Sequence, residues 1–81
     1  EPFIWLETAH NYMEMRQWRP AEAAIRKAIE RDGQNADYFA TLGRILLELE
    51  DFDGAREAAA EAEALVPEDP AVVELLRDIQ R

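Results

Sequence analysis

The size and polarity of the residues in this chain repeat at an interval of 34 positions. A shift of that length places Trp5 on Phe39, Ala9 on Gly43, Tyr12 on Leu46, Trp18 on Phe52, Ala21 on Ala55, Ala24 on Ala58 and Ala28 on Ala62. A fixed interval is typical of repeat architectures, in which each unit buries its apolar face against its neighbours. We therefore predict one domain over 1–81, with repeats at 2–35 and 36–69 and a terminal or capping helix at 70–81.

Apolar residues recur at spacings of three and four positions, as amphipathic helices require. Two such series are Ala21, Ala24, Ile25, Ala28 and Ile29, and Tyr38, Leu42, Ile45, Leu46 and Leu49. Only three Gly and four Pro occur among 81 residues, whereas good helix formers are plentiful. The predicted fold class is all-α.

Capping and helix-breaking residues mark the expected ends of the helices. Asn35 and Asp69 suit N-caps, Pro2, Pro20 and Pro70 suit first turns, Gly33 suits a C-terminal stop, and Pro67 lies just past another helix end. The predicted helices span residues 2–15, 19–32, 36–49, 53–66 and 70–80.

These residues carry a family resemblance. Segment 36–69 resembles a tetratricopeptide repeat, with Phe39, Leu42, Gly43, Leu46, Ala55, Ala62 and Pro67 on the signature positions. Segment 2–35 is similar through Trp5, Tyr12, Ala21 and Ala28, and it carries Thr8, Ala9 and Gly33 where Leu, Gly and Pro are usual. The resemblance implies a right-handed superhelical α-solenoid of antiparallel helical hairpins.

Small and aromatic residues are assigned different places in the predicted core. The small ones at Ala9, Gly43, Ala21, Ala55, Ala28 and Ala62 would let the helices of a hairpin approach closely. The aromatic ones at Trp5, Tyr12, Trp18, Phe39 and Phe52 are expected to fill wider gaps.

Charge narrows the class of partner. The net charge is −9, with five basic and six acidic residues in 1–35 against four basic and twelve acidic ones in 36–81. Nucleic acids and anionic membranes are bound mainly by clustered Lys and Arg, so neither is an expected partner. The chain has no Cys, which fits a reducing compartment, and we expect a cytoplasmic location.

Catalytic and metal chemistry find little support in the residue types. The chain has no Cys and no Ser, and Thr8 and Thr41 are its only Thr, so no nucleophile with an activating base can be assembled. Glu7, His10 and Glu14 could share one helix face, but the second repeat offers Thr41, Arg44 and Glu48 there, and Arg44 disfavours a cation. We expect no enzyme activity, no cofactor and no metal.

The first helix of each hairpin would line a concave groove in such a solenoid. The expected lining is Phe3, Leu6, His10, Met13 and Glu14, then Asp37, Ala40, Arg44, Leu47 and Glu48, then Ala71, Glu74, Asp78 and Arg81. This surface predicts a protein-interaction module, an adaptor or scaffold, whose partner is a protein or peptide with an apolar anchor and basic residues. The alternative is a structural unit that self-associates as a homo-oligomer, or a part of a longer repeat array.

Overall fold

The computed structural model describes the backbone of residues 2–80 and the side chains of residues 3–80. It contains five helices in this part of the chain and no strand: α1 Pro2–Glu14, α2 Trp18–Arg31, α3 Ala36–Glu48, α4 Phe52–Leu65 and α5 Pro70–Gln80. The all-α prediction is confirmed, and each predicted helix end lies within one residue of the observed one.

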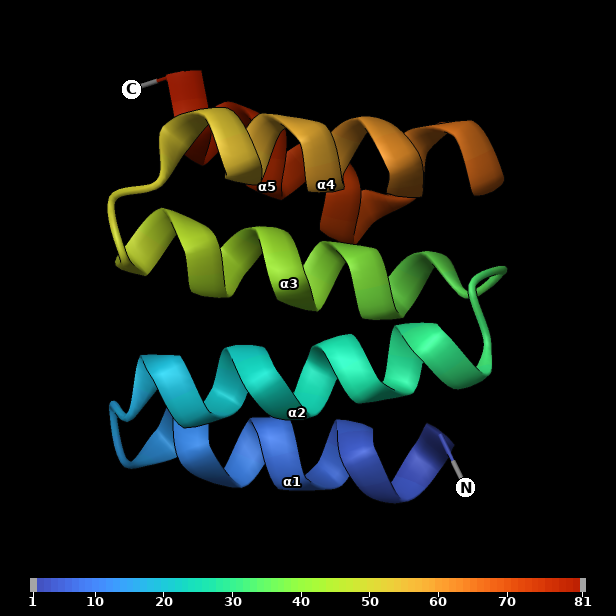
Figure 1. Cartoon of the computed structure of the whole chain (residues 1–81). Coiled ribbons are helices and arrows are strands. Elements are labelled where there is room, and N and C mark those ends of the chain that lie inside the picture. The colour runs from blue at the N-terminus through green and yellow to red at the C-terminus, as the bar shows by residue number, and fades with distance from the viewer. Residues whose placement is uncertain (1, 81) are drawn as a thin grey trace.

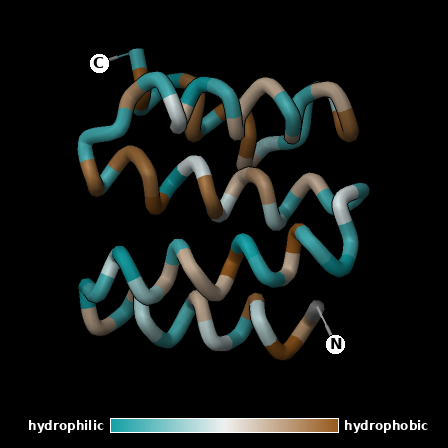
Figure 2. The backbone as a smooth tube through the Cα atoms, viewed as in Figure 1, coloured by the Kyte–Doolittle hydropathy of each residue, from teal (hydrophilic) through white to brown (hydrophobic). Residues whose placement is uncertain are grey.

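The helices stack in chain order, with successive helices running in opposite directions (Figure 1). The tightest pairs are α1 with α2 and α3 with α4, and contacts between α2 and α3 join the two hairpins. Helix α5 packs against both α3 and α4, and it therefore covers the end of the stack opposite α1. Apolar and polar residues alternate along each helix in the tube of Figure 2, as expected for helices that bury one face.

Small residues form much of the core, as the sequence predicts. Ala9, Ala21, Ala28, Ala55 and Ala62 are all fully buried. Helices that meet at Ala or Gly can approach closely because no long side chain separates their backbones. Larger aliphatic residues join the hairpins to one another and to α5, and the largest fully buried side chains are Ile25, Ile45, Leu75 and Val72.

Four of the five aromatic residues expected in the core pack against it. Trp5, Tyr12 and Trp18 lie partly buried against the larger hydrophobic cluster, and Phe39 lies against the smaller one. The prediction is wrong for Phe52, which is 47% exposed at the first position of α4. The indole of Trp18 reaches the core from the equivalent position in α2, whereas the smaller ring of Phe52 does not.

Side-chain caps hold the helix starts. The Asn35 Oδ1 atom accepts a hydrogen bond from the Asp37 backbone N–H at 2.9 Å, and the Asp69 Oδ1 atom accepts one from the Ala71 N–H at 2.9 Å, so both predicted N-caps are confirmed. Asp51 caps α4 in the same way, through the Gly54 N–H at 3.0 Å. Such caps satisfy backbone donors that have no partner inside the helix.

Gly33 does not stop α2 through a glycine-specific conformation. The C-cap of α2 is Asp32, in extended conformation with φ −148°, and no glycine of the described residues has a positive φ. The left-handed conformation falls instead on Arg16, Glu50 and Glu68, with φ of 60°, 64° and 67°. Helix α2 therefore ends within one residue of the expected position, but without a left-handed glycine.

Both hairpin turns use the same hydrogen-bond pattern around a left-handed residue. After α3, the Glu50 N–H donates to the Leu47 carbonyl at 3.0 Å and the Asp51 N–H donates to the Leu46 carbonyl at 2.9 Å. This is the Schellman pattern, in which the left-handed position is usually Gly. After α1, the N–H groups of Arg16 and Gln17 repeat the pattern at 2.9 Å each.

Glu50→Gly is expected to stabilise the fold by up to about 1 kcal/mol. A left-handed conformation costs a residue with a Cβ about 1–2 kcal/mol, and the greater freedom of Gly in the unfolded chain offsets part of that gain. Urea unfolding of the variant beside Glu57→Gly, an exposed position in the middle of α4, provides the test. The helix-interior change should destabilise, so an equal loss in both variants would contradict the expectation.

Candidate peptide-binding groove

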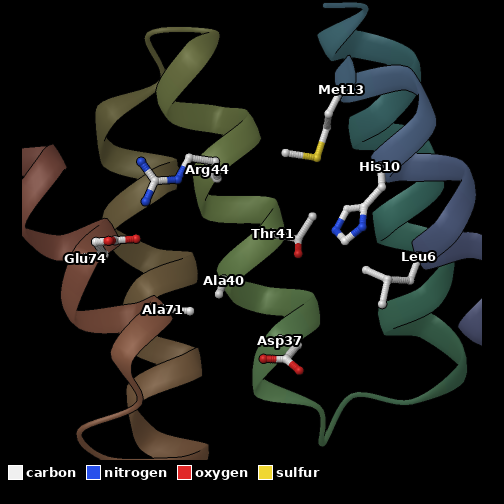
Figure 3. A pocket seen from close by; sticks show the side chains of 9 residues that line it. All are labelled: Leu6, His10, Met13, Asp37, Ala40, Thr41, Arg44, Ala71 and Glu74. Atoms are coloured by element: carbon white, nitrogen blue, oxygen red, sulfur yellow. The ribbon is translucent and has the colours of Figure 1, made fainter. Parts of the chain in front are cut away.

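Helices α1, α3 and α5 together line a shallow groove, which we call the A groove. Its cavity volume is about 350 Å³, and it is lined by Leu6, His10 and Met13 of α1, Asp37, Ala40, Thr41 and Arg44 of α3, and Ala71 and Glu74 of α5 (Figure 3). Figure 3 shows the α1 side chains on one wall, α3 along the floor and α5 on the opposite wall.

The 34-residue interval explains why these side chains meet. Positions 34 apart lie at equivalent points of successive first helices, so Leu6, Ala40 and Glu74 form one row across the groove. His10 and Arg44 lie at the next set of equivalent positions. The third member of that set, Asp78, lies outside the lining, and its Oδ2 atom forms an ion pair of 2.5 Å with Arg44 Nη1. The groove is thus built from corresponding positions of three helices.

The α1 wall supplies most of the apolar surface. Leu6 and Met13 are partly buried and pack against the larger hydrophobic cluster, which holds them in place. Ala40 and Ala71 face them with short side chains and so leave room for a side chain from outside. A thioether such as that of Met13 adapts its shape to different neighbours.

The floor and the wall opposite α1 carry the charged side chains of the groove. Arg44 is paired with Asp78, and both side chains are about one-third exposed. Asp37 and Glu74 are exposed, and neither forms an ion pair with another described residue. The A groove therefore combines an apolar wall with two carboxylates that form no ion pair with a described residue.

Most of the side chains predicted to line the groove are brought together there. They are Leu6, His10, Met13, Asp37, Ala40, Arg44, Ala71 and Glu74. Thr41 also lines the groove, although it is absent from the predicted lining. Its position one residue after Ala40, on the same helix face as Asp37 and Arg44, was the available signal.

Of the other predicted residues, those that the structure describes lie outside this lining. Leu47 turns toward the larger hydrophobic cluster and packs against it. Phe3 is 62% exposed near the start of α1, and Glu14 and Glu48 are exposed near the C-terminal ends of α1 and α3. Asp78 is engaged by Arg44 outside the lining, and Arg81 lies outside the described residues.

The described residues contain no cluster of three or more His, Cys, Asp or Glu side chains that could hold a metal ion. His10 lines the A groove, while Glu7 and Glu14 do not. None of the helices in residues 2–80 is long and apolar enough to cross a membrane.

The stacked hairpins and the groove between their first helices define a helical-repeat protein. The family model described as "Tetratricopeptide repeat" matches residues 12–79, and the chain therefore belongs to the tetratricopeptide repeat family. The family suggests a protein–protein interaction module and implies protein partners, and its members are generally not enzymes. A comparison with curated protein sequences gave no match.

Proposed function

We propose that this chain is an adaptor or scaffold module that binds a peptide or helix of another protein in the A groove. The proposal rests on one observation: the apolar wall formed by Leu6 and Met13 lies in the same groove as the carboxylates of Asp37 and Glu74, which form no ion pair with a described residue. A ligand with one bulky apolar side chain and a neighbouring Lys or Arg complements both features.

Apolar burial supplies most of the affinity in this proposal. Removing apolar surface from water contributes about 25 cal/mol per Å², from which the costs of association must be subtracted. Asp37 and Glu74 are exposed, and exposed ion pairs contribute only about 0.2–1 kcal/mol each. The carboxylates therefore mainly orient the ligand and speed its association.

Neutralising both carboxylates should weaken binding selectively. For fluorescently labelled peptides with a Leu, Phe or Trp anchor flanked by Lys, Asp37→Asn with Glu74→Gln should raise Kd about 2–30-fold, which corresponds to two exposed ion pairs. The matched control is Glu63→Gln with Glu68→Gln, which removes the same charge from exposed positions outside the groove. Fluorescence anisotropy measures the Kd of the labelled peptides for both double variants.

The anchor is tested separately with Leu6→Glu, which places a charge on the apolar wall and should abolish measurable binding of the same peptides. Circular dichroism shows whether the variant remains folded.

Raising the salt concentration from about 50 to 500 mM should slow association without eliminating binding, because salt screens exposed charges far more than apolar contacts. Equal affinities for the groove and control variants would refute the A groove as the binding surface.

A further inference from the structure

Two polar side chains in the middle of the A groove have no hydrogen-bond partner among the described residues. His10 of α1 and Thr41 of α3 both line the groove, and Figure 3 shows the imidazole ring reaching from α1 toward α3, where Thr41 lies. Neither side chain forms a hydrogen bond or an ion pair with another described residue. Their hydrogen-bonding capacity is therefore available to a molecule that enters the groove.

The other threonine of the chain behaves differently. Thr8 lies outside the A groove, and its hydroxyl donates to the Ile4 carbonyl oxygen, four residues earlier in α1, at 3.0 Å. A bond of this kind to the same helix is a common partner for a Thr hydroxyl in a helix. Thr41 is half-buried inside α3, but its hydroxyl forms no such bond to the Asp37 carbonyl. The Thr8 hydroxyl is thus used by its own helix, whereas that of Thr41 is left for the groove.

The surroundings of these two side chains are apolar. Leu6 and Met13 lie four residues before and three residues after His10, on the same face of α1. The buried Ala40 precedes Thr41 in α3. An apolar anchor that packs against the α1 wall must therefore also displace water from His10 and Thr41. Polar groups that lose water and gain no hydrogen bond weaken binding, so a well-matched ligand places hydrogen-bonding groups there.

The main chain of an extended segment provides such groups at every residue. Each residue other than Pro carries one N–H donor and one C=O acceptor. In a helix these groups bond to one another along the axis, whereas in an extended segment they remain available to a neighbouring molecule. A neutral imidazole and a hydroxyl can each donate and accept. His10 and Thr41 therefore match the main chain of an extended ligand better than that of a helix.

The length of the groove limits how many residues of such a segment it holds. Asp37 and Arg44, which line it near its two ends, are seven residues apart on α3, or about 10 Å of helix. About three extended residues cover that distance. Because alternate residues of an extended segment point to the same side, an anchor against Leu6 and a basic residue beside Asp37 or Glu74 are expected two positions apart.

We propose that the A groove binds its ligand as an extended segment of another protein, with main-chain groups bonded to His10 and Thr41 and with an apolar anchor and a Lys or Arg two positions apart. This assignment rests on the proposed function, because it concerns the ligand of the same groove. A helical ligand would instead carry the anchor and the basic residue three or four positions apart, since those positions share a helix face.

Two labelled peptides of identical composition test the spacing. Both have acetylated and amidated ends and about ten residues, too few for a stable helix alone. One Leu and one Lys stand two positions apart in the first peptide and three apart in the second. The first should bind about 2–5-fold more tightly, because only there do both side chains share a face of an extended chain. Equal affinities, or the opposite order that a helical ligand gives, would overturn the proposal.

The main-chain hydrogen bonds are tested by N-methylating the first peptide at one amide at a time, from the Leu to the Lys. Methylation of at least one amide should raise Kd about 2–10-fold, which is the usual contribution of one hydrogen bond. In Thr41→Val or His10→Leu the same methylation should cost clearly less, because the acceptor has already been removed and the two changes are coupled. Full additivity at every amide would contradict main-chain recognition.

Thr41→Val keeps the branched shape of the side chain and should by itself raise Kd of the first peptide about 2–10-fold. Thr8→Val is the matched control, because it removes a hydroxyl outside the A groove and should leave Kd unchanged. An equal change in both variants would speak against the bond to Thr41.

Failure of this assignment and failure of the proposed function give different results. If Leu6→Glu abolishes binding while Thr41→Val and His10→Leu leave Kd unchanged, the A groove binds the peptide but does not hold its main chain. If neither peptide binds at about millimolar concentration, or if Leu6→Glu has no effect on Kd, the groove and the extended ligand are refuted together.

Discussion

Gly43→Leu is expected to lower the free energy of unfolding by at least about 3 kcal/mol, the upper end of the usual range for overpacking a core. A Cβ atom at position 43 would lie 2.5 Å from Leu75 Cδ2, 3.4 Å from the Ala55 carbonyl oxygen and 3.5 Å from Ala58 Cβ. Leu75 is 1% exposed and belongs to the larger hydrophobic cluster, so moving its side chain disturbs other core residues. The added side chain would therefore push α3 away from both α4 and α5. Thermal and urea unfolding measure the loss.

Two further variants locate the cause of this loss. Gly33→Ala is the matched control, because its Cβ would meet only the Ile29 carbonyl oxygen at an ordinary 3.6 Å, and it should be neutral or stabilising. Gly43→Ala should lose part of its cost when Leu75→Ala removes the nearest atom, so that the two changes are not additive. Full additivity, or an unchanged unfolding midpoint in Gly43→Leu, would mean that α3 does not approach α5 at this glycine.

Ile25→Ala is expected to destabilise the protein by about 2–5 kcal/mol, the range for truncating a buried aliphatic residue to Ala. Ile25 is fully buried and lies in the cluster that joins α2 to α3, so its removal leaves a cavity between the two hairpins. A domain of this length has a stability of only about 4–12 kcal/mol. The variant should unfold at much lower urea concentration.

Ile29→Ala provides the comparison on the same helix. Ile29 is only partly buried against the cluster, so the same truncation should cost clearly less than at Ile25. Unfolding followed by both circular dichroism and tryptophan fluorescence would show whether the two hairpins still unfold together. A loss at Ile25 no greater than at Ile29 would contradict the packing of the hairpins on one another.

Local sequence patterns were sufficient to predict the five helices and most of the residues at which they begin and end. Apolar residues at three- and four-residue spacing define helical faces, and Asn35 and Asp69 cap helices through bonds that span only two residues. The 34-residue interval also predicted most of the residues that line the groove, because corresponding positions of equivalent helices face the same way. Periodicity and local hydrogen bonding act within a few residues, and so they can be read along the chain.

Packing between helices that are distant in the sequence decided which side chains face the groove and which face other helices. Leu47 lies one repeat after Met13, and both pack against the larger hydrophobic cluster, yet only Met13 lines the groove. Arg44 and Asp78 were both expected to face a ligand, but they meet each other once α5 packs on α3. Helix rotation and ion pairing between helices are set by how volumes and charges fit across the whole stack. Amphipathic periodicity therefore specified the five helices and their apolar faces, while the tertiary packing decided which exposed side chains remain available to a partner.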